Sequence, residues 1–317
     1  MILTLTPNPS IDRTVALDGE LCRGQVQRVT GVTAQAGGKG VNISRAAAVA
    51  GLPTMAVVPA EPEDPFVLEL RAAGIDCLPV HPAGDVRVNL TITEPDGTTT
   101  KLNSPGARVG PEHLEVMAEA VLERAADAAW TVLAGSLPAG APAGFYADLV
   151  TRLRQHGARV AVDTSEAPLR ALVDAMPAAA PDLMKPNGEE LASILGGDPE
   201  VLESDPAAAA EAAHGLLARG VGAVLATLGG NGAVLVTAEG AWHASPPPTT
   251  VVSTVGAGDC SLFGYLLGDV TGLPAPDRLA LAVAYGSAAA SLPGTTIPAA
   301  DQLRTELVGV TAIGGTK

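Results

Sequence analysis

The sequence predicts an α/β fold in which a doubly wound, mostly parallel sheet has helices on both faces and carries a small antiparallel β lid. Short apolar runs alternate with helical patterns along the chain, which is typical of βαβ units around a parallel sheet. Two segments, at about residues 13–34 and 86–103, instead have period-two character with no helix between their pieces. The chain has 317 residues, 47% of them hydrophobic, and is long enough for one large α/β unit.

The apolar runs predict the strands, and the helical periodicity between them predicts the helices. We expect strands at residues 2–6, 54–58, 130–134, 159–162, 183–184, 223–227 and 251–253. We expect helices at residues 40–50, 112–126, 144–155, 189–195, 206–218, 259–267 and 277–290. The turn signal EPDG joins the two halves of the second lid segment. No linker or repeat indicates a second domain, so we predict one domain over residues 1–317.

Composition narrows the functional classes. A formal net charge of −15 argues against nucleic acid or an anionic membrane as the main partner. The start MILTLTPNPS has neither the basic region nor the apolar core of a signal peptide, and no stretch predicts a transmembrane span. Cys22, Cys77 and Cys260 show no metal spacing and no paired pattern, so we predict a reduced, cytoplasmic protein.

Polar or glycine-rich segments follow the predicted strands, at the ends where an open parallel sheet binds ligands. These segments are PNPSID, GSLP, DTS, KPNGEE, LGGNG and TVGAGD. Any one of them could be a helix cap or a turn, but one large polar cleft explains the whole set better. Lysine is rare in this chain, and the internal lysines lie in AGGKGVN, TTKLNSPG and LMKPNGEE, where a compact charge suits a phosphate.

The segment TVGAGD predicts an anion site beside a carboxylate. Gly256, Ala257 and Gly258 let the backbone N–H groups at a helix start approach an anion closely. Asp259 could simply cap that helix, but a capping residue needs no glycine-rich approach. A carboxylate there could instead remove a proton from a hydroxyl that attacks a bound phosphoryl group, while the N–H groups stabilise the developing charge.

Two glycine-rich segments imitate other nucleotide motifs. GGKG resembles the end of a P-loop, but Gly40 follows Lys39 where that motif needs Ser or Thr, and residue 33 is not Gly. GAGDCS resembles a dinucleotide fingerprint, but Asp277, at about the distance of the required acidic residue, opens a helical pattern rather than ending a strand. We therefore disfavour a dehydrogenase.

Taken together, the motifs resemble the PfkB (ribokinase-like) carbohydrate kinase family. The stretches AGGKGVNISRAA, KPNGEE, TLGGNGA and STVGAGDCSLFGYLLG occur in the family's order and span nearly the whole chain. The resemblance implies a ribokinase-like fold and an ATP-dependent phosphotransferase that uses Mg²⁺. TLTPNPSIDRT and VRVNLTITEPDGTTTKLNSPG are most similar to the 1-phosphofructokinase subgroup, which converts fructose 1-phosphate to fructose 1,6-bisphosphate. Tagatose-6-phosphate kinases and 6-phosphofructokinases of the family remain alternatives, and a non-catalytic sugar- or nucleotide-binding regulator is a remote one.

The resemblance also implies residue roles. Asp259 matches the catalytic base, and Gly256, Ala257 and Gly258 match the anion hole. The family's sugar-binding positions are matched by Asp12, Gly38, Lys39 and Asn42. The positions that bind the substrate's phosphate are matched by Arg87, Asn89, Lys101 and Ser136. The ATP phosphates are assigned to Lys185 and Asn187, the metal to Glu190, and the nucleotide loop to Thr227, Gly229 and Gly232. The lid matches an element that often forms a homodimer interface.

Simpler roles stay open for some of these residues. Arg87 could be a solvated lid charge, and Glu190 could be a first-turn helix carboxylate. Cys260 stands where the family often has Ser, and a helix N-terminus can lower the pKa of a thiol, so we predict oxidative sensitivity. Val255 stands where many relatives have Thr, which leaves a monovalent-cation site open.

Overall fold

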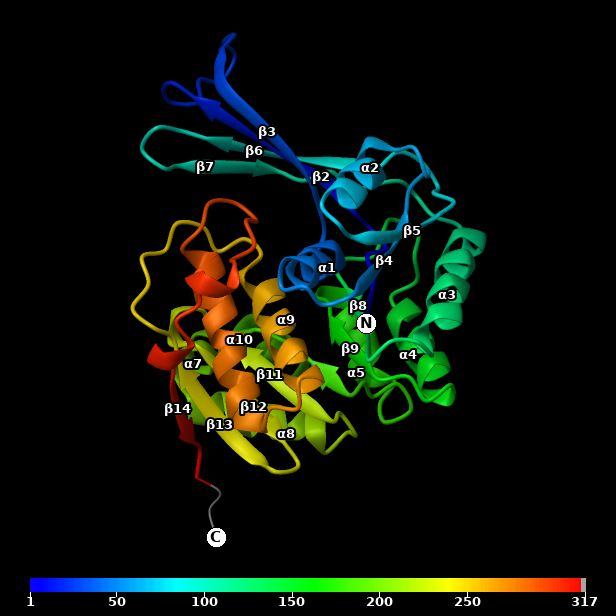
Figure 1. The fold of residues 1–317 in the computed structure, drawn as a ribbon, viewed down its shortest axis with the longest axis vertical. Helices are drawn as coiled ribbons and strands as arrows, with labels where there is room; N and C mark the ends of the chain where they lie inside the picture. The colour runs from blue at the N-terminus through cyan, green and yellow to red at the C-terminus, as the bar shows by residue number, and fades with distance from the viewer. Residues whose placement is uncertain (315–317) are drawn as a thin grey trace.

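The computed structural model describes residues 1–314, and within them the main sheet has ten strands in the order β14-β13-β12-β11-β10-β9-β8-β1-β4-β5 (Figure 1). Seven neighbouring strands are parallel. They are β1 (Ile2–Leu5), β4 (Thr54–Pro59), β5 (Asp76–Val80), β8 (Trp130–Ala134), β9 (Val160–Asp163), β10 (Leu183–Met184) and β11 (Ala223–Thr227). The antiparallel edge is formed by β12 (Ala233–Thr237), β13 (Gly240–Ser245) and β14 (Gly309–Ala312). The predicted mostly parallel sheet is confirmed.

Helices cover both faces of this sheet, because its strands are apolar on both sides. In β1, for example, Ile2 packs into one core cluster while Leu3 and Leu5 pack into the other. One cluster lies under α1 (Lys39–Val49), α9 (Ala257–Val270) and α10 (Ala275–Ala290). The other lies under α3 (Pro111–Ala125), α4 (Phe145–Gln155), α5 (Glu166–Asp174), α6 (Gly188–Leu195), α7 (Pro199–Ser204) and α8 (Pro206–Leu217). A smaller cluster lies under α2 (Pro65–Ala72).

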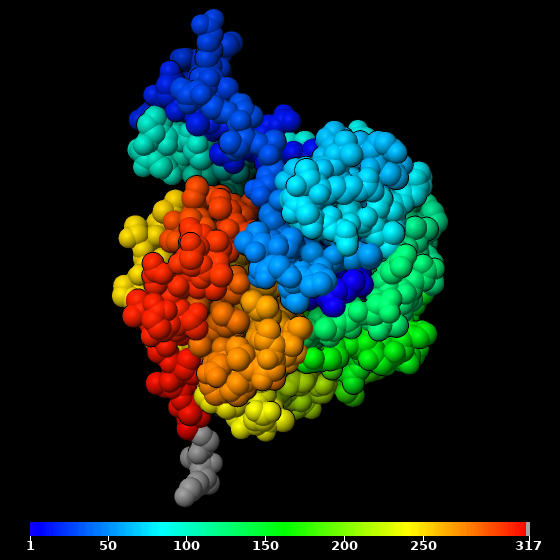
Figure 2. Space-filling view, in the orientation of Figure 1, coloured from blue at the N-terminus to red at the C-terminus, as the bar shows by residue number. Residues whose placement is uncertain are grey.

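The predicted lid is a separate four-stranded sheet that projects from the main body (Figures 1 and 2). Its strands are ordered β3 (Val29–Gly37), β2 (Ser10–Leu17), β6 (Arg87–Thr93) and β7 (Thr99–Leu102). The hairpins β2–β3 and β6–β7 are antiparallel, and the central pair β2–β6 runs parallel. At the base of the lid, buried Arg45 of α1 donates to the carbonyl of Ala36 and to Glu69 of α2, which ties β3 to the main body.

The element boundaries show where the sequence was misleading. The predicted strand at 251–253 is wrong: this segment is irregular, Val251 and Val252 are exposed, and the N–H of Val252 donates to the carbonyl of Ala290 at the end of α10. The helices α2, α5 and α7 were not predicted. Within residues 1–314, no helix combines the length and the apolar character needed to cross a membrane.

Candidate active site

The centre of the site lies where α1 and α9 begin, at the carboxyl ends of the parallel strands. Helix α1 can start there because it begins in glycines that pack directly on the end of β1. Gly38 has a φ of 124°, and a Cβ on it would lie 2.6 Å from Cγ2 of Thr6. A Cβ on Gly40 would lie 2.9 Å from the carbonyl oxygen of Leu5. Any larger residue would push α1, and with it Lys39 and Asn42, away from the strand ends.

The start of α9 has the geometry of an anion site. Gly256 is the N-cap with a φ of 80°, a left-handed conformation that favours glycine, and no side chain caps the helix. The N–H of Ala257 donates to the carbonyl of Thr254 at 3.3 Å and that of Cys260 to the carbonyl of Gly256 at 2.9 Å, so among the described residues the N–H groups of Gly258 and Asp259 are the first-turn donors without an acceptor. A Cβ on Gly258 would lie 3.3 Å from Nζ of Lys185, so the absence of a side chain lets this ammonium group reach the same turn.

Asp259 is buried in the first turn of α9, with 7% of its surface exposed. Its Oδ2 accepts a hydrogen bond from Nδ2 of Asn42 at 2.7 Å, which fixes the carboxylate relative to α1. Burial, and then repulsion from Asp163, raise the pKa of Asp259 to about 6, although Lys39, Asn42 and Lys185 act in the opposite direction. A carboxylate with this pKa is a stronger base than an exposed one and is still mostly ionised at neutral pH.

Asp163, the last residue of β9, connects the two lysines of the site. Its side chain is fully buried, with Oδ1 2.7 Å from Nζ of Lys39 and Oδ2 3.2 Å from Nζ of Lys185. Burial disfavours the ionised carboxyl, but the two lysines outweigh it and lower the pKa of Asp163. Burial alone would lower the pKa of Lys39, but the charges of Asp163 and Asp259 outweigh it. The net effect raises the pKa of Lys39, which is therefore held charged. The segment DTS indicated a polar end to this strand, but no role was predicted for Asp163.

The lid supplies a second group of polar side chains. Asp12 on β2 accepts hydrogen bonds from Oγ of Ser10 at 2.7 Å and from Nδ2 of Asn89 on β6 at 3.0 Å. Arg87, at the start of β6, is half-buried, and its guanidinium donates to the carbonyl of Ser104 at 2.7 Å, while its Nε has no hydrogen-bond partner among residues 1–314. Burial lowers the pKa of Arg87 and Asp12 opposes this. Arg87 is therefore not the fully solvated charge that the simpler interpretation required.

Lys101 and Ser136 lie at the edges of this group. Lys101 is exposed on the edge strand β7, where it pairs with Thr91, two residues from Asn89 on the same face of the lid. Ser136 follows β8, beside a cleft of about 250 Å³ that is bounded on the other side by the start of α5. Ser136 thus lines the cleft from the loop after β8, whereas Lys101 lies on the lid.

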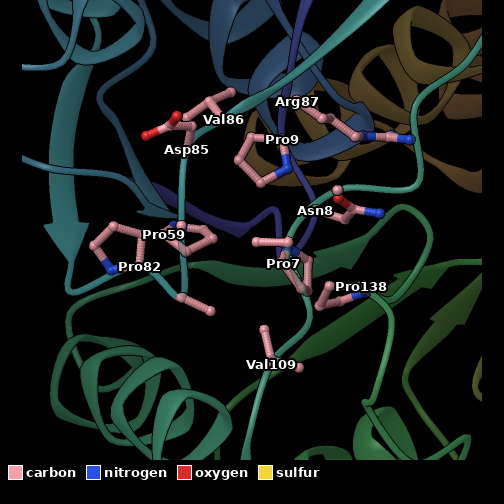
Figure 3. Close-up of a pocket in the computed structure, with 14 residues that line it drawn as sticks. Pro7, Asn8, Pro9, Pro59, Pro82, Asp85, Val86, Arg87, Val109 and Pro138 are labelled. Atoms are coloured by element: carbon pink, nitrogen blue, oxygen red, sulfur yellow. The ribbon is translucent and has the colours of Figure 1, made fainter.

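Asn8 is a polar residue of this region that sequence analysis missed. It is 9% exposed, its Nδ2 donates to the carbonyl of Pro105 at 3.2 Å, and it lies 3.5 Å from Oγ of Ser136. Figure 3 shows the polar ends of Asn8 and Arg87 extending to the same side, away from the prolines Pro59 and Pro82. The sequence signal that could have identified Asn8 was its place in PNPSID, between two prolines at the end of a predicted strand.

The residues assigned to the nucleotide form local turns. Oδ1 of Asn187 accepts from the N–H of Glu190 at 2.8 Å, and Oε2 of Glu190 accepts from the N–H of Asn187 at 3.0 Å, which is a capping box at the start of α6. Thr227, at the end of β11, pairs with Asn187 through a parallel bridge. Gly229 and Gly232, with φ of 53° and 86°, form the turn into β12, and a side chain on Gly232 would overlap the carbonyl of Ala244.

Cys260 does not have the reactive environment that we expected. It is 1% exposed, and burial, followed by the nearby charge of Asp259, raises the pKa of its thiol to about 12. The expectation of a lowered pKa is therefore wrong, because Cys260 faces the core side of α9 rather than the solvent at its N-terminus.

Comparisons with known proteins agree on one family. The sequence model described as pfkB family carbohydrate kinase matches residues 6–302. A 1-phosphofructokinase of Rhodobacter capsulatus is 37% identical over 306 residues, covering 95% of this chain and 94% of the relative. A 1-phosphofructokinase of Xanthomonas campestris is 38% identical over 286 residues, covering 88% of each. Phosphofructokinase-2 from Escherichia coli, solved in complex with substrates and products, has a TM-score of 0.86 at 28% identity, covering 96% of this chain and 97% of that one.

Proposed function

The chain belongs to the PfkB family of carbohydrate kinases and is therefore an ATP-dependent sugar phosphotransferase, and we propose that it phosphorylates the 6-hydroxyl of fructose 1-phosphate. The observation that carries the proposed chemistry is the buried Asp259 beside the uncapped, glycine-rich start of α9. The choice of sugar is supported by the curated relatives, which are named 1-phosphofructokinases. The product would be fructose 1,6-bisphosphate.

Phosphoryl transfer follows from the placement of charge. Asp259 accepts the proton of the 6-hydroxyl as that oxygen attacks the γ-phosphorus of ATP, the bond from this phosphorus to ADP breaks, and ADP leaves. Asn42 holds the carboxylate in position through its 2.7 Å hydrogen bond. The first-turn N–H groups of α9 and the ammonium group of Lys185 stabilise the negative charge on the transferred group.

The sugar would lie between the start of α1 and the lid. Asp12 and Asn89 present polar atoms from the lid, and Gly38, Lys39 and Asn42 present theirs from α1. The substrate's own phosphate would bind among Arg87, Lys101 and Ser136. The unpartnered Nε of Arg87 supports this assignment, because a phosphate oxygen can satisfy a buried guanidinium donor.

ATP would extend from the anion hole toward the turn after β11, with Lys185, Asn187, Thr227, Gly229 and Gly232 along its path. Within residues 1–314 no three His, Cys, Asp or Glu side chains cluster as a metal cage. The residues still fit Mg²⁺, which takes most of its ligands from water and substrate phosphates and needs only one or two carboxylates. Glu190 would be that carboxylate, because the capping box occupies its Oε2 alone. Mg²⁺ would neutralise charge on the ATP phosphates.

We also propose that residues 1–317 form one kinase domain that dimerises through the outer face of the lid. The strand registers put the polar residues Asp12, Gln35, Asn89 and Lys101 on one face of the lid. The other face is mainly apolar and carries Val15, Val32, Ala34, Leu90, Ile92 and Leu102, together with Thr100 and the exposed Arg13, which pairs with Ala34 and Leu90. A sheet face of this composition requires a partner, and a second copy would supply a matching surface. A tetrameric inhibited form has been solved for E. coli phosphofructokinase-2, at 28% identity.

The substrate proposal is tested by an ADP-release assay with MgATP and five sugars: fructose 1-phosphate, fructose 6-phosphate, tagatose 6-phosphate, fructose and ribose. We expect the highest kcat/KM with fructose 1-phosphate. Preference for a 6-phosphate would keep the roles of Asp259 and the anion hole but reject the proposed phosphate site. No turnover with any of the sugars would favour a sugar- or nucleotide-binding regulator instead.

A further inference from the structure

The loop that follows α10 contacts the lid and the anion hole at the same residue. Oγ1 of Thr295 donates to Oε1 of Gln35 on β3 at 3.0 Å, across 260 positions of sequence. On its other side, Cα and Cγ2 of Thr295 lie 3.8 Å from the position that a Cβ on Gly256 would take. Figure 1 shows this orange-red loop rising from α10 toward the lid strands, and Figure 2 shows its surface beneath the lid. Thr295 therefore lies between the two parts of the site.

The lid end of this contact leads directly to the sugar site. Gln35 pairs with Asp12 across the β2–β3 ladder, and Asp12 pairs with Asn89 across β2–β6. Directly opposite residues in a sheet share a face, so Gln35 lies beside the carboxylate proposed to bind the sugar. Asp12 is in turn fixed by its hydrogen bonds from Ser10 and Asn89. Any displacement of Asp12 should therefore also displace Gln35.

The nucleotide end leads to the residue that shapes the anion hole. Gly256 holds a left-handed backbone conformation, with a φ of 80°, and sets the direction of the first-turn N–H groups of α9. Thr295 packs against this glycine through its backbone and its methyl group. A displacement of Thr295 would free the space beside Gly256, and the turn would lose a contact that maintains its conformation.

We propose that Thr295 is a positioning residue, and that its hydrogen bond to Gln35 couples the lid to the anion hole so that sugar and nucleotide strengthen each other's binding. This inference rests on the proposed function for the location of the two ligands. The coupling is reciprocal by thermodynamic necessity. The bond joins two neutral, half-buried groups, and such a bond is weak enough to break each time the lid opens to release product.

The test compares nucleotide binding with and without the sugar. The affinity for a non-hydrolysable ATP analogue with Mg²⁺ is measured alone and at a saturating concentration of the phosphosugar that the wild-type enzyme turns over best. If that sugar is not fructose 1-phosphate, the substrate proposal fails, but the coupling is still measured with the sugar that is used. We expect the sugar to tighten analogue binding in the wild type, and this factor to fall by roughly 2–10-fold in Thr295→Val.

Three further variants separate coupling from a general role in the loop. Gln35→Met should lose the same factor, and the double variant should lose no more than either single one. Thr295→Ser keeps the hydroxyl and should keep the coupling. Thr296→Val is the matched control, because Oγ1 of Thr296 is exposed and donates only within its loop, to the carbonyl of Pro293 at 2.7 Å.

Several results would overturn the proposal. These are a wild type without coupling, a coupling factor unchanged in Thr295→Val and Gln35→Met, additive losses in the double variant, or an equal loss in Thr296→Val. Equal melting temperatures of the variants and the wild type would show that the comparison is made on folded protein.

Discussion

At the scale of the single residue, the raised pKa of Asp259 sets the pH range of activity. The base must be ionised to accept a proton, and burial together with Asp163 raises its pKa to about 6. We expect kcat/KM for the sugar to be constant above this value and to fall about tenfold per pH unit below it. A pH profile measured with enzyme that stays folded over the range checks this, and a rate that remains constant down to pH 4.5 would contradict it.

Replacing Asp259 by Asn should lower activity and raise stability. We expect turnover to fall by at least ~10²–10⁴-fold. A carboxyl whose folded-state pKa is raised above its unfolded value of 3.8 costs stability as the pH rises through the interval between them, and the full cost is present above about pH 6. The Asn variant should therefore have a free energy of unfolding higher than that of the wild type by roughly 1–3 kcal/mol at pH 7–8, and a higher melting temperature. The difference should vanish below pH 4, and a variant less stable at pH 7–8 would contradict the assigned burial cost.

Asp163 should act on Asp259 and on both lysines. In Asp163→Asn, repulsion on Asp259 is lost, so we expect the acid limb of the pH profile to move to lower pH. Turnover should also fall, by roughly 10–100-fold, because Lys39 and Lys185 lose the carboxylate that orients them. Asp182→Asn is a matched control, since Asp182 binds the N–H of Val160 at the opposite end of β9. An acid limb at the same pH as in the wild type, or an equal shift in Asp182→Asn, would contradict the proposed effect of Asp163 on Asp259.

At the scale of the element, helix α5 begins in a strained conformation beside the cleft next to Ser136. Glu166, its first residue, has a φ of 56°, which is left-handed and costs energy for any residue with a Cβ. We expect Glu166→Gly to be more stable than Glu166→Ala by roughly 1 kcal/mol, because both lose the carboxylate but only Gly loses the strain. Thermal unfolding of the two variants measures this difference, and equal stabilities would show that the segment relaxes.

The elements predicted most accurately were those whose local pattern decides their structure. Strands at 130–134 and 223–227 match the structure to the residue, because each is a short apolar run buried on both faces. Helix α2 was missed because its eight residues start at Pro65, the last residue of PEDP, and bury only one narrow face. The strand at 251–253 was wrong because two valines gave a β signal although the segment has no neighbouring strand to pair with.

At the scale of the whole molecule, long-range contacts set the limits of sequence reasoning. The βαβ alternation predicted a mostly parallel sheet but not the order of its strands, and the grouping of Lys39, Asn42 and Asp259 was anticipated from the family resemblance. The ion pairs of Asp163 with the two lysines join residues far apart in sequence, and no spacing rule encodes them. Cys260 was misjudged for the same reason: the helix start is visible in sequence, but the core that buries the thiol is not.

The two faces of the lid lead to the last prediction, which concerns assembly. Val32 is 55% exposed on the apolar outer face, opposite Val15 and on the far side of the sheet from Asp12 and Gln35. We expect sedimentation to give a mass of about twice the 31.7 kDa of one chain for the wild type. Val32→Lys should shift this mass toward that of the monomer, because it adds a second positive charge to the face that carries Arg13 and buries an ammonium group between two copies without an anionic partner.

Val201→Lys serves as the control for that variant, since Val201 is similarly exposed, at 48%, but lies on α7, far from the lid in sequence. It makes the same chemical change and should leave the mass unaltered. A monomeric wild type, or a dimer that survives Val32→Lys, would mean that the outer face of the lid is not the interface. If the dimer forms as proposed, the apolar face is buried permanently and the polar face remains free to cover the sugar, because the registers separate the two sets of residues by strand parity.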